Sequence, residues 1–166
     1  MLRRIHGLLL RVYARLPVQG RRFIVRTIAP GYTVGAMCFI EREDGALLLL
    51  RLAYRKRWGV PGGLLKRGED PGVACRREVM EEVGLDISLV GEPAVQVDAA
   101  ARRIDIIYRA KPIASVGADE AEPMSPEIVE VRWFPAGQLP ELQFETSGAL
   151  VCLARAQNLT PSFDHH

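Results

Sequence analysis

The chain has 166 residues, of which 48% are apolar and 25% are charged, and its formal net charge is +2. This length and composition are ordinary for one soluble globular domain with a hydrophobic core. The three cysteines, Cys38, Cys75 and Cys152, lie far apart and form no C-x-x-C pair. They argue against a disulfide framework or a zinc site and favour a reducing cytoplasm.

The charge is distributed unevenly along the chain. Residues 1–57 contain 12 basic and 3 acidic residues, whereas residues 58–166 contain 10 basic and 17 acidic residues. A basic half followed by an acidic half is compatible with a metal-dependent site for polyphosphates. It is equally compatible with an anionic membrane or with nucleic acid, so charge alone leaves three classes of partner open.

Residues 2–16 carry apolar residues at three- and four-residue spacing with arginines between them, which predicts a basic amphipathic helix that ends at Pro17. The stretch lacks a small-residue cleavage site and is broken by Arg11, which argues against a signal peptide. No apolar run approaches the about 18 residues that a membrane span needs. This helix has three candidate roles. It could pack against the domain or a partner subunit, bind an anionic membrane surface or bind nucleic acid.

From Tyr32 the pattern changes to strands. Residues 34–52 contain two apolar runs joined by an acidic turn with glycine, which predicts a β-hairpin whose Leu47–Leu50 run belongs to the core. Three arginines follow in the next loop and are candidates for contact with substrate phosphates, because arginine binds phosphate in a bidentate manner; they are Arg51, Arg55 and Arg57. A solvated loop is the other interpretation of this cluster.

A helix is expected from about Asp70, a good N-cap, to Gly84, which tolerates the left-handed conformation after a helix end. Glu78, Glu81 and Glu82 lie three and four residues apart and therefore share one face of that helix. Three adjacent carboxylates repel one another, and a divalent cation would turn that repulsion into attraction. Oxygen ligands of this kind suit Mg²⁺ or Mn²⁺.

The stretch from Gly63 to Leu85 consists of glycine, five residues, Glu69, seven residues and then Arg77-Glu78-Val79-x-Glu81-Glu82-x-Gly84-Leu85. It resembles the Nudix box, G-x5-E-x7-R-E-U-x-E-E-x-G-U with U aliphatic, at every specified position. The resemblance implies an α/β fold, the Nudix-type α/β/α sandwich with a mixed β-sheet, over residues 32–158. Residues 1–31 are then a basic N-terminal helix with its connector, and residues 159–166 are a C-terminal tail.

The resemblance also implies the activity: Mg²⁺-dependent hydrolysis of a pyrophosphate bond in a nucleoside diphosphate linked to another moiety, by attack of water at phosphorus. In this family the carbonyl of the residue matching Gly63 often joins the metal shell, and the residues matching Glu69 and Arg77 commonly pair and support the catalytic turn. The implied metal ligands are Gly63, Glu78, Glu81 and Glu82.

A further carboxylate is expected at the start of the strand that precedes Trp133-Phe134, where the family often completes its metal or catalytic-base set. Glu127 matches that place best, and Glu130 is the second candidate. Which carboxylate acts as the base is left open by the sequence. The implied catalytic residues are therefore Glu78, Glu81, Glu82 and Glu127.

The remaining pattern predicts two strands at residues 87–99 and 102–113, a loop at 113–126 that could cover the site, a strand at 127–134 and a closing helix at 146–158.

The sequence does not identify the substrate. Subfamily markers of NADH, coenzyme A, ADP-ribose and diadenosine polyphosphate hydrolases do not appear, so a small nucleotide, either a nucleoside triphosphate or a nucleotide sugar, is the expected partner. A homodimer and a membrane surface, through residues 2–16, are further candidate partners, and no dedicated nucleic-acid-binding domain is visible. The alternatives are a non-catalytic nucleotide sensor, a membrane-surface hydrolase of a lipid-linked or isoprenoid diphosphate and, more weakly, an RNA-cap hydrolase.

Overall fold

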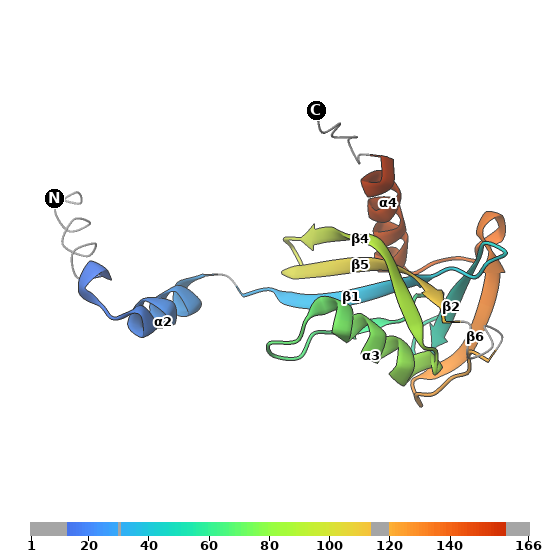
Figure 1. Cartoon of the computed structure of the whole chain (residues 1–166), viewed down its shortest axis with the longest axis horizontal. Helices are drawn as coiled ribbons and strands as arrows, with labels where there is room; N and C mark the ends of the chain where they lie inside the picture. The colour runs from blue at the N-terminus through green and yellow to red at the C-terminus, as the bar shows by residue number, and fades with distance from the viewer. Residues whose placement is uncertain (1–12, 30, 114–119, 159–166) are drawn as a thin grey trace. The chain divides into compact units, whose positions relative to one another are not determined.

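The computed structural model describes residues 13–29, 31–113 and 120–158, and the chain divides into two compact units, Met1–Tyr32 and Thr33–His166 (Figure 1). In the first unit, the described end of the predicted N-terminal helix is helical at residues 13–15, and its residues 1–12 lie outside the described part. Arg21 donates hydrogen bonds to the carbonyls of Leu16, at 2.9 Å, and of Ala14, and so links the chain on both sides of Pro17.

Helix α2 (Val18–Ile28) has no counterpart among the predicted elements. Its sequence VQGRRFIVRTI contains a helix-weakening glycine, but it is amphipathic, with its arginines gathered on one side of the helix, so the periodicity that would have predicted it is present. No helix in the described parts of the chain is long and apolar enough to cross a membrane.

The second unit contains a mixed four-stranded sheet and a separate two-stranded antiparallel sheet, so the predicted α/β class with a mixed sheet is confirmed. In the larger sheet the order is β3-β1-β5-β4, with β1 parallel to β5 and the other pairs antiparallel. Its strands are β1 (Thr33–Ile40), β3 (Gly62–Leu64), β4 (Ile87–Asp98) and β5 (Arg103–Pro112). The smaller sheet pairs β2 (Ala46–Leu52) with β6 (Ile128–Pro135).

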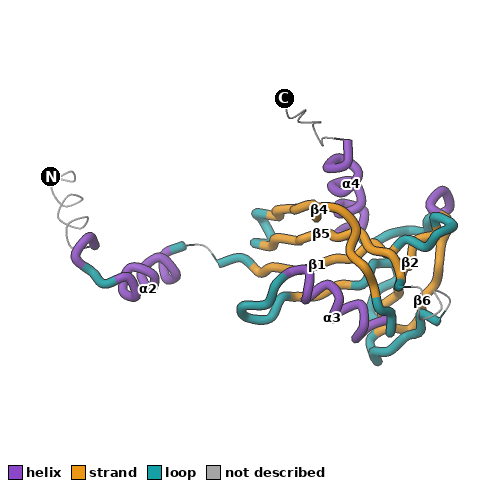
Figure 2. The backbone as a smooth tube through the Cα atoms, in the orientation of Figure 1, coloured by secondary structure: helices purple, strands orange, loops and turns teal. Residues whose placement is uncertain are grey.

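Helices α3 (Pro71–Val83) and α4 (Phe144–Asn158) cover opposite faces of the larger sheet (Figure 2). Successive side chains of a strand point to opposite faces, so the central strand β1 contributes side chains to two hydrophobic clusters, one on each face of the sheet. Cys38 and Ile40 belong to the cluster that contains the buried side of α3, whereas Phe39 packs in the cluster of α4. A short 3₁₀ helix, Ala136–Gln138, connects β6 to the segment before α4.

The predicted hairpin over residues 34–52 is wrong. Strands β1 and β2 belong to different sheets, and next to the turn between them the chain forms the isolated bridge Glu41–Leu47. The physical reason is that β1 already pairs on both edges, with β3 and β5, so β2 finds its partner in β6. The core assignment of the leucine run is confirmed for Leu48, Leu49 and Leu50, which are buried.

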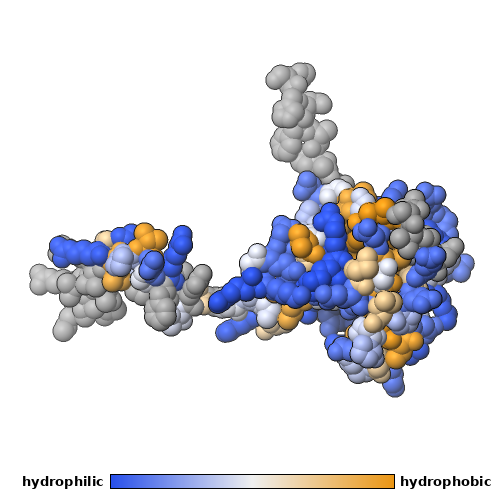
Figure 3. All heavy atoms as spheres, turned by 60° about the horizontal axis from the view of Figure 1, so that its bottom comes forward, coloured by the Kyte–Doolittle hydropathy of each residue, from blue (hydrophilic) through white to orange (hydrophobic). Residues whose placement is uncertain are grey.

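The apolar side of α3 differs in part from the expected one. Val79 and Val83 are fully buried as predicted, but Val73 and Met80, which the sequence places on the same side, are 54% and 46% exposed. The helix turns Ala74, Val79 and Val83 toward the sheet. Apolar residues are common on protein surfaces, and those of the second unit appear as separate patches on a largely hydrophilic face (Figure 3).

Candidate active site

Helix α3 carries most of the candidate site residues, and both of its ends are fixed as the sequence predicts. At the N-terminus the Asp70 side chain accepts hydrogen bonds from the backbone N–H groups of Gly72, at 2.9 Å, and Val73, at 3.1 Å. At the C-terminus Gly84 has φ 69° and its N–H donates to the carbonyl of Met80 at 3.1 Å. Caps at both ends set the length of the helix and the face on which its glutamates lie.

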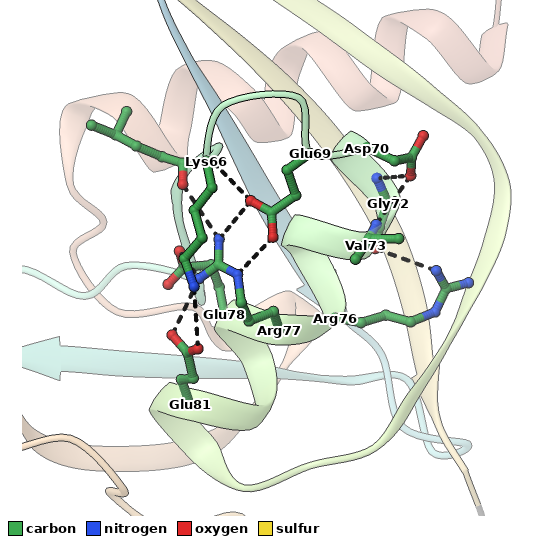
Figure 4. Close-up of polar contacts among 10 residues, drawn as sticks. Lys66, Glu69, Asp70, Gly72, Val73, Arg76, Arg77, Glu78 and Glu81 are labelled. Atoms are coloured by element: carbon green, nitrogen blue, oxygen red, sulfur yellow. Dashed lines mark hydrogen bonds and ion pairs between the residues drawn. The ribbon is translucent and has the colours of Figure 1, made fainter.

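Arg77 lies at the centre of a network of carboxylates (Figure 4). It donates from Nε and Nη2 to the two oxygens of Glu69 at 2.8 and 2.9 Å, and from Nη1 to Glu78 at 2.7 Å and Glu81 at 3.2 Å. Hydrogen bonds from Arg77 and from the N–H of Lys66 lower the pKa of Glu69 to about 2. The network joins the loop after β3 to α3 and holds two of the predicted metal-binding carboxylates in place.

The strand β3 brings two glycines against these carboxylates. The N–H of Gly62 donates to Glu82 Oε2 at 2.9 Å. A Cβ at Gly63 would lie 2.4 Å from Glu78 Oε1, and one at Gly62 would lie 2.4 Å from the carbonyl oxygen of Ala36. Real Cβ atoms do not come this close, so Gly62 is required by the backbone of β1, whereas a side chain at Gly63 would force the Glu78 carboxylate to move.

Glu82 has an unusual electrostatic environment. Burial first, and then the charges of Glu78, Glu127 and Glu81, raise its pKa to about 7 against the opposing effect of the Gly62 N–H. Ionised carboxylates that crowd one another in this way are stabilised by a proton or by a cation. A positive charge beside Glu82 would therefore relieve the repulsion among these carboxylates.

The donor set fits a divalent cation by its chemistry, although the ligands are not assembled around one point. Among the described residues, no group of three His, Cys, Asp or Glu side chains is arranged to hold a metal ion. The reason is visible in the network, because Arg77 binds oxygens of both Glu78 and Glu81. The side chain of Glu81 is 55% exposed and has room to reorient, and hard carboxylate and carbonyl oxygens are the ligands that Mg²⁺ and Mn²⁺ prefer.

Glu127 and Glu130, the two candidates for the further carboxylate, differ in their surroundings. Glu127 lies just before β6, accepts a hydrogen bond from the hydroxyl of Tyr54 at 3.3 Å and is near enough to Glu82 to raise its pKa. Glu130 accepts from Arg51 Nη2 at 2.8 Å, and this hydrogen bond lowers its pKa. The structure thus brings Glu127 toward the glutamates of α3 and holds Glu130 in an ion pair.

The three arginines predicted to contact phosphates are each paired with an acidic side chain: Arg51 with Glu130, Arg55 with Glu145 at 3.8 Å, and Arg57 with Glu141. Of the three, Arg55 lines the cavity that contains Glu82. Arg51 and Arg57 are not among the residues that line it.

That cavity has a volume of about 160 Å³ and is bounded by Gly62 and Glu82, by Arg55 and Arg103, and by the start of α4. Arg103 is a residue that the sequence did not single out. The signal that could have found it is the pair Arg103-x-Asp105, which places two opposite charges on one face of the strand RIDIIYRAKP.

A larger hollow of about 820 Å³ lies between β4 and α4. Its lining includes Val95 and Val97 and contains none of the predicted site residues. We therefore place the candidate active site at the smaller cavity, where the carboxylates and arginines are.

The predicted loop over residues 113–126 is described from residue 120, and its residues 114–119 lie outside the described part. The N–H groups of Glu122 and Met124 donate to the carbonyls of Val83, at 3.2 Å, and of Glu82, at 3.0 Å. The described part of the loop therefore binds to the C-terminal end of α3.

The family model for the NUDIX domain matches residues 31–153. The chain therefore belongs to the Nudix family of hydrolytic enzymes, and the resemblance of residues 63–85 to the Nudix box is confirmed. Nudix hydrolases generally use a divalent metal ion.

Three similar proteins illustrate the range of the family. A MutT-like protein of Streptomyces ambofaciens is 30% identical over 119 residues, which are 72% of this chain and 74% of the relative. Diphosphoinositol polyphosphate phosphohydrolase 3-beta of Bos taurus is 45% identical over 64 residues, 36% of this chain and 39% of the relative. The structure of an ADP-ribose pyrophosphatase from Streptococcus suis matches 78% of this chain and 94% of its own with a TM-score of 0.61 and 23% identity, which is a likeness of fold.

Proposed function

We propose that the protein hydrolyses the pyrophosphate bond of a nucleoside diphosphate linked to another moiety, with Mg²⁺ as its divalent ion and Mn²⁺ as a substitute. The observation that carries the proposal is the position of Glu82. Its carboxylate is held by the Gly62 N–H at 2.9 Å, and burial together with the neighbouring negative charges raises its pKa to about 7. A divalent cation would relieve the repulsion within this cluster, and it would also neutralise the charge that keeps a nucleophile from a pyrophosphate.

Glu78, Glu81, Glu82 and the carbonyl of Gly63 are the groups that would hold the ion. When bound, a divalent ion neutralises phosphate charge and lowers the pKa of a water molecule. The chain's own contribution is the arrangement of these groups, because Arg77 positions Glu78 and Glu81 through its hydrogen bonds of 2.7 and 3.2 Å. The Glu69–Arg77 pair is thus a support for the ligands.

Glu127 is the proposed general base. A base must lie within hydrogen-bond reach of the attacking water, and it must be free to accept a proton. Glu127 is exposed, lies near Glu82 and accepts a hydrogen bond from Tyr54 at 3.3 Å, whereas Glu130 is bound to arginine. The water oxygen would attack phosphorus and its proton would pass to Glu127. The bond from phosphorus to the leaving phosphate oxygen would break in the same step.

A nucleotide is the favoured substrate because an ADP-ribose pyrophosphatase shares the fold over 94% of its own chain. The local match to a diphosphoinositol polyphosphate phosphohydrolase, over 64 residues, makes an inositol diphosphate a second class to test. An isoprenoid diphosphate is the third class, motivated by the basic amphipathic pattern of residues 2–16.

The test is hydrolysis of a panel from these three classes by the full-length protein with Mg²⁺, with products identified by mass spectrometry. Replacement of Glu82 by Gln keeps its shape and removes its charge, and we expect the rate to fall by more than about a hundredfold, since changes behind a metal ligand alone cost 10- to 100-fold. Glu92→Gln, at an exposed position of β4, is the matched control and should behave as the wild type. A Glu82→Gln protein with the wild-type rate would contradict the proposal.

A further inference from the structure

Arg103 and Asp105 form an ion pair on β5, on the face of the sheet that α4 partly covers. Arg103 Nε lies 2.8 and 2.9 Å from the two oxygens of Asp105, whose residue exposure is 8%. Neither of these bonds uses the terminal nitrogens Nη1 and Nη2 of the guanidinium. Asp105 therefore orients the guanidinium through Nε, and this ion pair does not occupy the outer donors on Nη1 and Nη2.

The pair lies next to the metal-binding end of β3 because Gly35 has no side chain. Gly35 is in register with Asp105 on the neighbouring parallel strand β1. A Cβ at Gly35 would lie 2.6 Å from Asp105 Oδ1, 3.2 Å from Arg103 Nη2 and 3.4 Å from the carbonyl oxygen of Gly63. The guanidinium and the Gly63 carbonyl thus border the same small space above Gly35.

Arg103 also lines the cavity that contains Glu82 and Arg55. Its side chain is 37% exposed, so the guanidinium is accessible to a ligand that enters the cavity from solvent. A phosphate between the guanidinium and the Gly63 carbonyl would be attracted both to Arg103 and to a cation held by that carbonyl. No aromatic side chain is found among the described residues that line the cavity, so a nucleobase has no ring to stack on.

We propose that Arg103, held by Asp105 and seated beside the Gly63 carbonyl over Gly35, binds the diphosphate of the substrate through its Nη donors. The assignment rests on the proposed function, and it names a residue outside the Nudix box. Planar N–H donors of arginine match phosphate oxygens in a bidentate manner. The phosphate so held would lie between the guanidinium and the Gly63 carbonyl, which is among the groups that would hold the divalent ion.

The experiment measures binding of methylenediphosphonate, a diphosphate that cannot be hydrolysed, to the full-length protein by calorimetry at constant excess Mg²⁺. Charge-assisted hydrogen bonds contribute about 1.5–3 kcal/mol, so Arg103→Ala should weaken binding by about ten- to a hundredfold. Arg103→Lys keeps the charge and loses the planar donors, and we expect an intermediate loss. In turnover assays both variants should raise KM for the substrate found in the panel.

Arg109→Ala is the matched control. Arg109 lies on the same strand and the same face, is 38% exposed and pairs with Glu41 at 2.9 Å, but it does not line the cavity of Glu82. It should bind methylenediphosphonate as the wild type does. Circular dichroism of each variant checks folding, and Arg103→Lys carries the test if the alanine variant does not fold.

The outcomes separate this inference from the proposed function. Wild-type affinity in both Arg103 variants, with hydrolysis of a diphosphate by the wild-type protein, would overturn the role of Arg103 and leave the proposed function standing. A wild-type protein that hydrolyses no member of the panel, but loses methylenediphosphonate binding on Arg103 replacement, would contradict the proposed function and support the phosphate site.

Discussion

Arg77 donates to both oxygens of Glu69, from Nε at 2.8 Å and from Nη2 at 2.9 Å, and this pair joins the loop after β3 to the middle of α3. The same guanidinium reaches Glu78 and Glu81, so one arginine links the support of the helix to two predicted metal ligands. A change at Glu69 should therefore alter the positions of Glu78 and Glu81, although Glu69 itself is not expected to bind the ion.

We expect Glu69→Gln to lower kcat or the apparent affinity for Mg²⁺ by about 10- to 100-fold, as changes behind metal ligands do. A Mg²⁺ titration of the hydrolysis rate separates the two effects. Glu43→Gln, at an exposed turn, serves as the control and should match the wild type. If Glu69→Gln has the wild-type Mg²⁺ dependence and rate, Arg77 holds its carboxylates without Glu69.

The same substitution predicts a change in acid stability. Hydrogen bonds from Arg77 and from the Lys66 N–H lower the pKa of Glu69 from 4.5 to about 2. A carboxyl with a lowered pKa in the folded state stabilises the protein above about pH 4.5, and this contribution is lost as the pH falls from 4.5 to about 2. The difference in urea midpoint between wild type and Glu69→Gln should thus shrink over that range. A difference independent of pH would mean that the carboxylate charge does not matter.

The raised pKa of Glu82 predicts a pH dependence of stability with the opposite sign. Burial and neighbouring carboxylates raise its pKa from 4.5 to about 7, so the metal-free protein loses stability as the pH rises from about 4.5 to 7. Replacement by Gln should remove that part of the pH dependence. Mn²⁺ binding at pH 6 should release a proton from the wild type, because ligands must be deprotonated to bind. Calorimetry in two buffers of different ionisation enthalpy measures it, and equal proton release by Glu82→Gln would exclude Glu82 as its source.

Helix α3 could be predicted closely because its signals are local. Asp70 and Gly84 mark the ends through contacts with backbone groups within four residues, and the spacing of Glu78, Glu81 and Glu82 places them on one face. The family motif then assigns roles to these positions without any knowledge of the sheet.

The sheet pairing could not be predicted in the same way. Whether β2 pairs with β1 depends on β5, which occupies the parallel edge of β1 from far along the chain, and on β3 at the other edge. Arg103 was missed for a related reason. The local pair Arg103-x-Asp105 indicates an ion pair on one face of the strand, but the place of Arg103 in the site depends on Gly35 of β1 and on the carbonyl of Gly63, which are far from it in the chain.

Substitution of Gly63 provides a steric test of the site. Gly63→Ala would place a methyl group 2.4 Å from Glu78 Oε1, and Glu78 would have to move away from β3. We expect strongly reduced Mg²⁺-dependent hydrolysis with a smaller loss of folding stability. Gly137→Ala is the control, because a Cβ there meets nothing within 4 Å. Normal Mn²⁺ affinity in Gly63→Ala, measured by titration with Mn²⁺ and electron paramagnetic resonance, would argue against Glu78 as a ligand.

The roles of Glu127 and Glu130 are separated by one pair of isosteric changes. If Glu127 accepts the proton of the attacking water, Glu127→Gln should lower kcat by about 10²- to 10⁴-fold and leave the Mg²⁺ concentration for half-maximal rate unchanged. If Glu127 is a metal ligand instead, that concentration should rise. Glu130→Gln removes the partner of Arg51, an ion pair at 2.8 Å that is partly exposed, and should change the rate little.

The pH–rate profile completes this comparison. Loss of a general base removes the acidic limb that its ionisation causes, whereas loss of a metal ligand leaves the limb and alters the Mg²⁺ requirement. A Glu130→Gln protein with the larger loss of kcat would reverse the assignment, because Glu130 would then have to leave Arg51 and turn toward the glutamates of α3.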